Sequence, residues 1–364
     1  MTAPPFVPPR TTLSCVIMAH PNRHERAERL RAALGDLDAS IVYDPDPRGP
    51  RTTVRTAAAA WSALPSGATH QLVLQDDVEP TPDFAARLRN VVAAAPDRPV
   101  SLFVDWGCVT ATMVRWGALS GADLVECVDP FVPTQGVVLP SALAPGLVEA
   151  MTRALAAGKT DDDVVLREYL AARGTRALVT VPSLVDHADQ GSLMSHEAAG
   201  VRRATCLSDA GDPAFTGAVL RAPAWVPNQT WSKGRAMCMR VGPGFTGEPT
   251  RRVLAAHGAP TALFRTELDG VLDRAKADLE LHCGYALLHE LWHTAVAIGV
   301  LSPGPIDPGR PSATRALATM APGALRCFVA PDALETCGPD LNDLVRTGVE
   351  LGIDHWTEQQ SPSI

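Results

Sequence analysis

The chain has 364 residues, a formal net charge of -8 at pH 7, and a composition of 46% hydrophobic and 20% charged residues. These proportions are typical of a folded globular protein and exclude a disordered chain. Because the chain is acidic and its basic residues are scattered, it lacks the positive footprint of a nucleic-acid-binding protein, so we expect no nucleic-acid partner. Its length favours one large domain or two smaller ones.

The first residues of the chain and its cysteines indicate the cellular compartment in which the protein is expected. The first ten residues, MTAPPFVPPR, contain four prolines and no apolar run, unlike a secretory signal. No segment is apolar over the length that a membrane span requires, so we expect a cytoplasmic protein. The eight cysteines form no C-x-x-C pair, and several lie in apolar stretches, which favours reduced thiols packed in the core.

Apolar patterning in the first half of the chain alternates between two periods. Residues 12–19 are a nearly continuous apolar run, typical of a strand that is covered on both faces. Residues 23–34 have amphipathic helix spacing, and residues 39–43 are again strand-like. Further helices are predicted over 52–63, 83–94, 140–157 and 161–172, and further strands over 71–75, 99–104, 136–139 and 176–181. This alternation predicts an α/β domain with a mostly parallel sheet and helices on both faces.

The second half has a different pattern. Prolines and glycines interrupt residues 207–261, as in a linker or a loosely patterned subdomain. Residues 262–300 are strongly helical, and residues 301–364 predict two short helices and a polar tail. We therefore expect an α/β domain over residues 1–205 and a mostly helical accessory region over residues 206–364. The accessory region could bind the acceptor, form a dimer or dock a carrier protein, and the sequence leaves these three roles open.

Two adjacent carboxylates, Asp76 and Asp77, follow the predicted strand QLVLQ. Open α/β sheets bind ligands outside the carboxyl ends of their strands. Carboxylates at a strand end can hold Mg²⁺ or Mn²⁺ against a diphosphate, because these ions prefer hard oxygen ligands. A simpler role is equally open, in which the negative charges of Asp76 and Asp77 stabilise the N-terminus of the helix that begins near Asp83.

Three segments carry a family resemblance: VIMAHPNRHERAERL, IVYDPDPRGPRTTVRTAAAAW and HQLVLQDDVEPTPDF. In order and spacing they resemble the nucleotide-binding half of GT-A glycosyltransferases, including lipopolysaccharide-type and bacterial secondary-metabolite members. The resemblance covers only the first domain. It implies a GT-A-like, Rossmann-like fold that transfers a sugar from a nucleoside-diphosphate donor, with Mn²⁺ or Mg²⁺ as cofactor. A UDP-sugar is the favoured donor, and the acceptor is a small molecule, peptide or glycan.

The resemblance also implies roles for residues near the first and third strands. The loop containing His20, Pro21 and Arg23 would contact the nucleotide, although His20 and Arg23 also suit solvated or capping roles. Asp76 would contact the ribose and Asp77 the metal. The motif Asp-Asp-Val is not a strict D-x-D, which leaves that division open.

A second group of implied contacts follows the second strand. Asp44 would contact the nucleobase. Arg51 and Arg55 lie in the segment that lines the nucleotide pocket in the family, where a guanidinium can bind phosphate in bidentate fashion. It is equally open that Arg51 and Arg55 are exposed helix residues that bind no ligand.

Two later segments complete the resemblance. Residues 161–163 are three acids at the start of a predicted helix, where they can act as caps. In the family an acid at this point serves an inverting enzyme as general base, so Asp162 or Asp163 would deprotonate the acceptor. The segment VTVPSLVDHADQGS resembles one that closes such domains, and it makes His187 a metal ligand. A solvated loop histidine is the alternative.

The accessory region contains a rival motif, HELWH, with His289 and His293 on one face of a helix predicted over residues 278–300. This H-E-x-x-H pattern is typical of zinc-dependent hydrolases, in which Glu290 would activate water. The sequence offers no familiar extended pattern for a third ligand, and the apolar helix favours buried, packed histidines. A zinc hydrolase and a catalytically inactive glycosyltransferase-like scaffold are the alternative functions.

Overall fold

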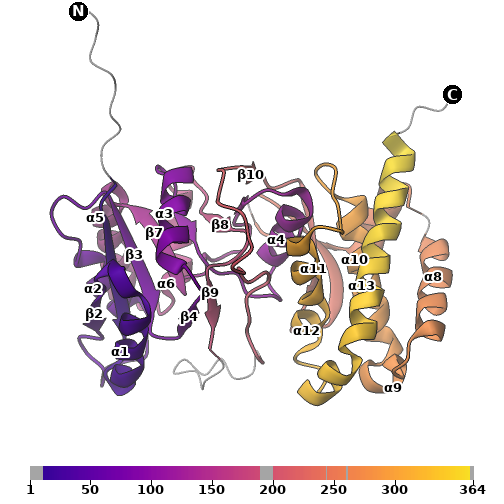
Figure 1. The fold of residues 1–364 in the computed structure, drawn as a ribbon, viewed down its shortest axis with the longest axis horizontal. Coiled ribbons are helices and arrows are strands. Elements are labelled where there is room, and N and C mark those ends of the chain that lie inside the picture. The colour runs from indigo at the N-terminus through magenta and orange to yellow at the C-terminus, as the bar shows by residue number, and fades with distance from the viewer. Residues whose placement is uncertain (1–10, 189–199, 243, 260, 361–364) are drawn as a thin grey trace, which may run out of the picture.

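The computed structural model describes residues 11–188, 200–242, 244–259 and 261–360. Figure 1 shows an elongated molecule with two parts side by side. The α/β part, coloured indigo to magenta, lies at the left, and a mostly helical part, orange to yellow, lies at the right. Within the described residues, no helix combines the length and the apolarity needed to cross a membrane.

An eight-stranded sheet forms the centre of the α/β part, in the order β10-β6-β8-β5-β7-β3-β1-β2. Its strands are β1 (Leu13–Ala19), β2 (Ser40–Tyr43), β3 (His70–Gln75), β5 (Val100–Ser101), β6 (Leu124–Glu126), β7 (Gly136–Pro140), β8 (Leu178–Thr180) and β10 (Val219–Leu220). Four of the seven neighbouring pairs are parallel, including β1 with both β2 and β3. The predicted mostly parallel sheet is therefore confirmed. The strand expected over residues 99–104 is shorter than predicted.

Helices cover both faces of the sheet, as predicted. Along β1, Cys15 and Ile17 belong to one hydrophobic cluster, and Val16 and Met18 belong to another, because successive strand side chains point to opposite faces. The first cluster includes α1 (His24–Ala33) and α3 (Phe84–Ala94). The second includes α2 (Val54–Ser62), α4 (Thr110–Ser120), α5 (Ala144–Ala156) and α6 (Asp162–Ala171).

The accessory part begins with a three-stranded antiparallel sheet of β11 (Trp225–Thr230), β12 (Arg235–Arg240) and β13 (Gly247–Pro249). The pattern of residues 207–261 had predicted only a linker or a loose subdomain. Seven helices are described after it: α7 (Thr250–Ala256), α8 (Thr261–Arg274), α9 (Leu279–Cys283), α10 (Tyr285–Val300), α11 (Pro311–Ala318), α12 (Met320–Leu325) and α13 (Pro331–Gln360). The helix predicted over residues 278–300 is interrupted at Gly284, whose φ is +78°.

Two short helices, α11 and α12, are present as predicted, but the polar tail predicted after them was wrong, because residues 331–360 form one helix, α13. Pro339 lies inside α13 and obscured it in the sequence, since proline normally ends a helix. Packing outweighs that penalty. A Cβ added to Gly352 would lie 2.2 Å from a backbone oxygen of α10, so the two helix backbones approach closely along their length.

The two parts share hydrophobic core. One cluster extends from β1 through α4 to α10 and α13, and Trp116 Nε1 donates a 2.8 Å hydrogen bond to the carbonyl of Ile298. The sheet also takes β10 from beyond residue 205. A boundary near that residue therefore stays a prediction.

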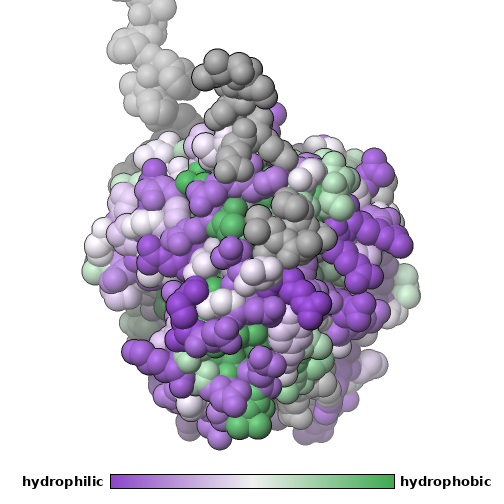
Figure 2. Space-filling model, turned by 90° about the vertical axis from the view of Figure 1, so that its right-hand side faces the viewer, coloured by the Kyte–Doolittle hydropathy of each residue, from purple (hydrophilic) through white to green (hydrophobic). Residues whose placement is uncertain are grey.

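The outer end of the accessory part, formed by α8, α9 and α13, is viewed in Figure 2, where polar residues predominate and apolar ones are interspersed among them. Among the described residues, three large hydrophobic side chains are exposed: Val219, Leu281 and Phe328. Seven of the eight cysteines are buried thiols.

Candidate functional site

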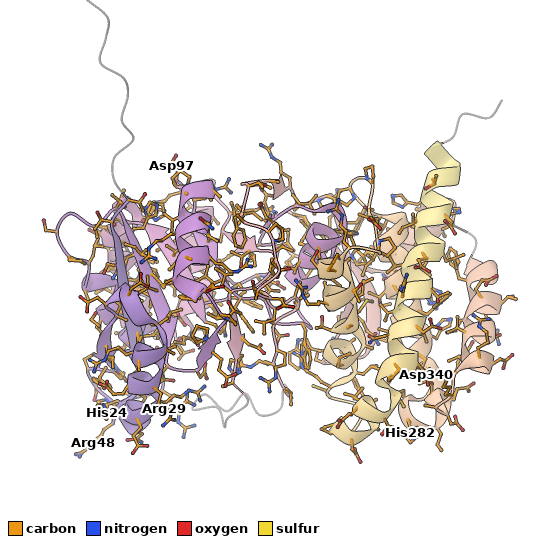
Figure 3. The ribbon with its side chains drawn as sticks, in the orientation of Figure 1. His24, Arg29, Arg48, Asp97, His282 and Asp340 are labelled. Atoms are coloured by element: carbon orange, nitrogen blue, oxygen red, sulfur yellow. The ribbon has the colours of Figure 1, made fainter. Side chains whose placement is uncertain are left out.

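A cavity of about 430 Å³ opens at the carboxyl ends of β1, β2 and β3. Since β2 and β3 lie on opposite sides of β1 and both run parallel to it, the strand order reverses there. Open α/β sheets bind ligands at such a switch point. Nine of the predicted residues line this cavity: His20, Arg23, Asp44, Arg51, Arg55, Asp76, Asp77, Asp162 and Asp163. In Figure 3, His24 and Arg48 mark this end of the α/β part, and their neighbours Arg23 and Gly49 line the cavity.

Asp76 and Asp77 lie between β3 and a short strand, β4 (Val78–Pro80), and are 6% and 8% exposed. Arg23 Nη1 lies 2.9 Å from Asp76 Oδ1 and 3.3 Å from Asp77 Oδ2. The backbone amide of His20 donates a 3.0 Å hydrogen bond to Asp76 Oδ2. Both oxygens of Asp76 are therefore engaged by the loop that follows β1, so this carboxylate positions His20 and Arg23.

The two carboxyls differ in their proton affinity. Burial raises the pKa of Asp76, although the hydrogen bond and charge of Arg23 act against this rise. Burial also acts to raise the pKa of Asp77, but His187 and the guanidiniums of Arg23 and Arg26 outweigh it and hold that pKa at about 2. Asp77 is therefore ionised at neutral pH.

His187 is brought to Asp77 by the pairing of β4 with β9 (Val185–His187), in which Val78 is the partner of His187. His187 is 4% exposed, and its Nε2 lies 3.4 Å from Asp77 Oδ2. Arg202, which lines the cavity, places Nη2 2.9 Å from the same Nε2. The structure thus brings together the two residues that were predicted to bind metal, and adds an arginine that sequence patterns did not indicate.

The donor chemistry of this pair fits a divalent cation that the substrate helps to bind. Among the described residues, no group of three or more His, Cys, Asp or Glu side chains is arranged to hold a metal. Mg²⁺ usually takes only one or two carboxylates and completes its octahedron with phosphate oxygens and water. Asp77 Oδ2 and His187 Nε2 lie 3.4 Å apart, against roughly 2.9 Å for adjacent ligands of an octahedral ion, so a small movement lets both atoms reach one cation. In addition, Asp77 Oδ1 is buried without a hydrogen-bond partner in the described structure.

Asp44 and Arg55 form a bidentate pair at the rim, with Arg55 Nε 2.6 Å from Asp44 Oδ1 and Nη2 2.8 Å from Oδ2. Arg55 also donates to the carbonyls of Asp46, at 2.6 Å, and Pro50, at 3.2 Å. Burial acts to raise the pKa of Asp44, but the hydrogen bonds from Arg55 and from the amide of Asp46 lower it overall. Arg55, predicted to bind phosphate, is here engaged in holding the loop of residues 44–50.

The N-terminus of α6 forms the opposite wall. The backbone amide of Thr53 donates to the carbonyl of Thr160 at 2.9 Å, and the amide of Asp162 donates to Thr53 Oγ1 at 3.0 Å. These bonds join the loops that precede α2 and α6. Asp161, the N-cap residue of α6, makes no capping hydrogen bond through its side chain.

Asp162 and Asp163 differ in their surroundings. Asp162 is 4% exposed, and burial raises its pKa against the hydrogen bonds of Thr53 and Thr134. Burial, followed by the charge of Asp162, raises the pKa of Asp163 to about 7. A carboxyl with this pKa exchanges protons near neutral pH, as a general base must.

The residues that line the cavity differ in part from the predicted set. Pro21 does not line the cavity; it begins a short 3-10 helix (Pro21–Arg23), where a missing amide hydrogen has no consequence. His20 caps that turn by accepting from the Asn22 amide at 3.1 Å. Thr134 and Arg202 line the cavity but belong to no pattern in the sequence, because each comes from a loop that only the fold brings near.

The HELWH motif lies on α10 in the accessory part, away from the cavity. The rings of His289 and His293 are 4.2 Å apart between centroids, and His293 Nδ1 lies 2.8 Å from the carbonyl of His289. Glu290 Oε2 accepts a 2.6 Å hydrogen bond from the amide of Ala236. Within the described residues a third metal ligand is absent, and Glu290 is engaged in attaching α10 to β12.

Comparison of the chain with protein-family models gave no match, and comparison with curated proteins gave none either. A function has therefore to be inferred from the residues around the cavity.

Proposed function

We propose that the chain is a GT-A-type glycosyltransferase that moves a sugar from a nucleoside diphosphate to an acceptor nucleophile, with Mn²⁺ or Mg²⁺ as cofactor. One observation carries this proposal. A single cavity at the switch point of the sheet gathers residues from four separate segments that resemble this family. Nucleotides bind at such points in open α/β sheets because several strand ends and loops converge there.

The donor would lie across the carboxyl end of β1. The loop of residues 44–50, held closed by Arg55, forms the rim on the side of β2 and suits the nucleoside. Arg51 and Arg202 line the same cavity and carry positive charge for a diphosphate. Arg23 keeps the two buried carboxylates in place below it.

Asp77 and His187 would hold the divalent cation. A bound Mn²⁺ or Mg²⁺ supplies neutralisation of the charge that develops on the departing nucleoside diphosphate. Because its neighbours hold its pKa below the ordinary value of a carboxyl, Asp77 is ionised at neutral pH.

Asp163 is the better candidate for the general base. Asp162 is buried and bonded to two threonine hydroxyls, so it suits a role in positioning the loops. Asp163 lines the cavity and has a pKa of about 7, close to the value that makes proton transfer efficient at neutral pH. Its carboxylate would accept the proton of the acceptor nucleophile during attack on the anomeric carbon.

Titration calorimetry with UDP, GDP and dTDP, each with and without Mn²⁺, tests this proposal. We expect at least one nucleotide, UDP first, to bind with an affinity that rises when Mn²⁺ is present. Absence of binding by all three nucleotides under both conditions would refute it.

A further inference from the structure

Arg202 and His187 meet at one atom. Arg202 Nη2 lies 2.9 Å from His187 Nε2, and a guanidinium has only N–H donors, so Nε2 must accept this hydrogen bond through its lone pair. A histidine nitrogen binds a metal through the same lone pair. The contact with Arg202 and coordination of a cation at Nε2 therefore exclude each other.

The proposed metal-binding oxygen of Asp77 also lies beside a guanidinium. Asp77 Oδ2 lies 3.3 Å from Arg23 Nη1 and 3.4 Å from His187 Nε2. The side chains of His187 and Asp77 are 5% and 11% exposed. Two guanidiniums thus occupy the surroundings of the two donor atoms proposed for the metal, and they balance the buried negative charge without it.

We propose that Arg202 is a positioning residue that exchanges between His187 Nε2 and the diphosphate of the donor. In this structure its guanidinium contacts the imidazole; when metal and nucleotide bind, the guanidinium moves to the phosphate oxygens. This inference rests on the proposed function. It makes metal and nucleotide bind cooperatively, because metal alone removes a hydrogen bond from Arg202, whereas metal with diphosphate provides a new acceptor.

The surrounding contacts allow this movement to be confined to one side chain. Arg203 Nη1 donates a 3.0 Å hydrogen bond to the carbonyl of His187, and the amide of Ala204 donates to Asp186 Oδ1 at 2.7 Å. The backbone that follows Arg202 is therefore attached to β9. Arg202 itself is only partly buried and lines the cavity, so its guanidinium can turn toward a ligand there.

Binding of Mn²⁺ alone, followed by electron paramagnetic resonance of the free ion, tests the competition at Nε2. In Arg202→Ala we expect Mn²⁺ to bind about tenfold more tightly than in the unchanged protein, because one charge-assisted hydrogen bond no longer opposes it. Arg203→Ala is the matched control: it removes a cation from the same segment and a hydrogen bond to the His187 carbonyl, but not the contact at Nε2. It should change Mn²⁺ affinity much less.

Calorimetry with UDP in saturating Mn²⁺ tests the second half of the exchange. Arg202→Ala should weaken UDP binding about tenfold, opposite to its effect on Mn²⁺ alone, whereas a merely structural role would weaken both. Unchanged or weaker Mn²⁺ binding in Arg202→Ala, or an equal gain in Arg203→Ala, would overturn the competition. If no nucleotide binds the unchanged protein, the proposed function fails and the exchange with it, while Mn²⁺ binding alone still decides whether Arg202 competes for Nε2.

Discussion

Replacing Asp163 by asparagine should stabilise the protein and do so increasingly as the pH rises. The pKa of Asp163 is about 7 in the folded chain, against an ordinary value of 3.8. Because folding raises this pKa, the folded state is most stable relative to the unfolded state below pH 4, where the carboxyl is protonated in both states. That stability is lost as the pH rises through 7. Asparagine carries no charge to lose.

The size of the effect follows from the pKa difference of about three units. At about 1.4 kcal/mol per unit, the raised pKa of Asp163 costs roughly 4 kcal/mol of folding free energy at pH 8. At pH 5, where the folded carboxyl is still protonated and the unfolded one is already ionised, it costs about 1.5 kcal/mol. Asparagine keeps an oxygen that can accept the 2.6 Å hydrogen bond from the Val164 amide. The variant should therefore gain roughly 2 to 3 kcal/mol more over the unchanged protein at pH 8 than at pH 5.

Urea denaturation of both proteins at pH 5 and pH 8 measures this difference. Asp161→Asn, in the same turn but exposed, is the control and should show little gain at either pH. A gain for Asp163→Asn that does not depend on pH, or no gain at pH 8, would refute a pKa near 7 and with it the role of Asp163 as a base.

Three further changes test other contacts. Arg55→Ala removes both hydrogen bonds to Asp44 and should weaken nucleotide binding in calorimetry about tenfold, while Arg55→Lys, which lacks the planar fork, should recover little of it. Gly352→Ala would place a Cβ 2.2 Å from a backbone oxygen of α10 and should lower the free energy of unfolding by about 1 to 3 kcal/mol in denaturant titration. Gly338→Ala on the same helix meets no atom within 4 Å and should not destabilise. Protein purified without added metal should contain no zinc by elemental analysis, and stoichiometric zinc that disappears in His293→Ala would restore the hydrolase hypothesis.

Much of the α/β part was predictable because its signals are local. The runs that became β1 and β3 are buried on both faces and therefore apolar at their centres, and each is followed by polar residues. Parallel pairing then brings those polar ends to one edge of the sheet. This is why Asp44, Asp76 and Asp77, which are separate in the sequence, line a single cavity.

The rest depends on contacts between distant segments. The sheet of β11, β12 and β13 has no run of clear alternation, and its strands are specified by pairing and by packing against α10. Pro339 indicates a helix end by itself, but close packing of α13 on α10 outweighs it. Arg202 could not be found from a pattern, because only the pairing of β9 with β4 brings His187, and the arginine beside it, to Asp77.

The most direct test of the proposed nucleotide site compares UDP binding to three proteins in the presence of Mn²⁺. Asp77→Asn removes the charge that would hold the cation, whereas Glu79→Gln removes a neighbouring charge that is exposed on β4. We predict that titration calorimetry will show UDP binding to the unchanged protein and to Glu79→Gln, and loss of the Mn²⁺-dependent part of that binding in Asp77→Asn. Equal Mn²⁺-dependent binding to all three proteins would contradict a site at the carboxyl ends of β1, β2 and β3.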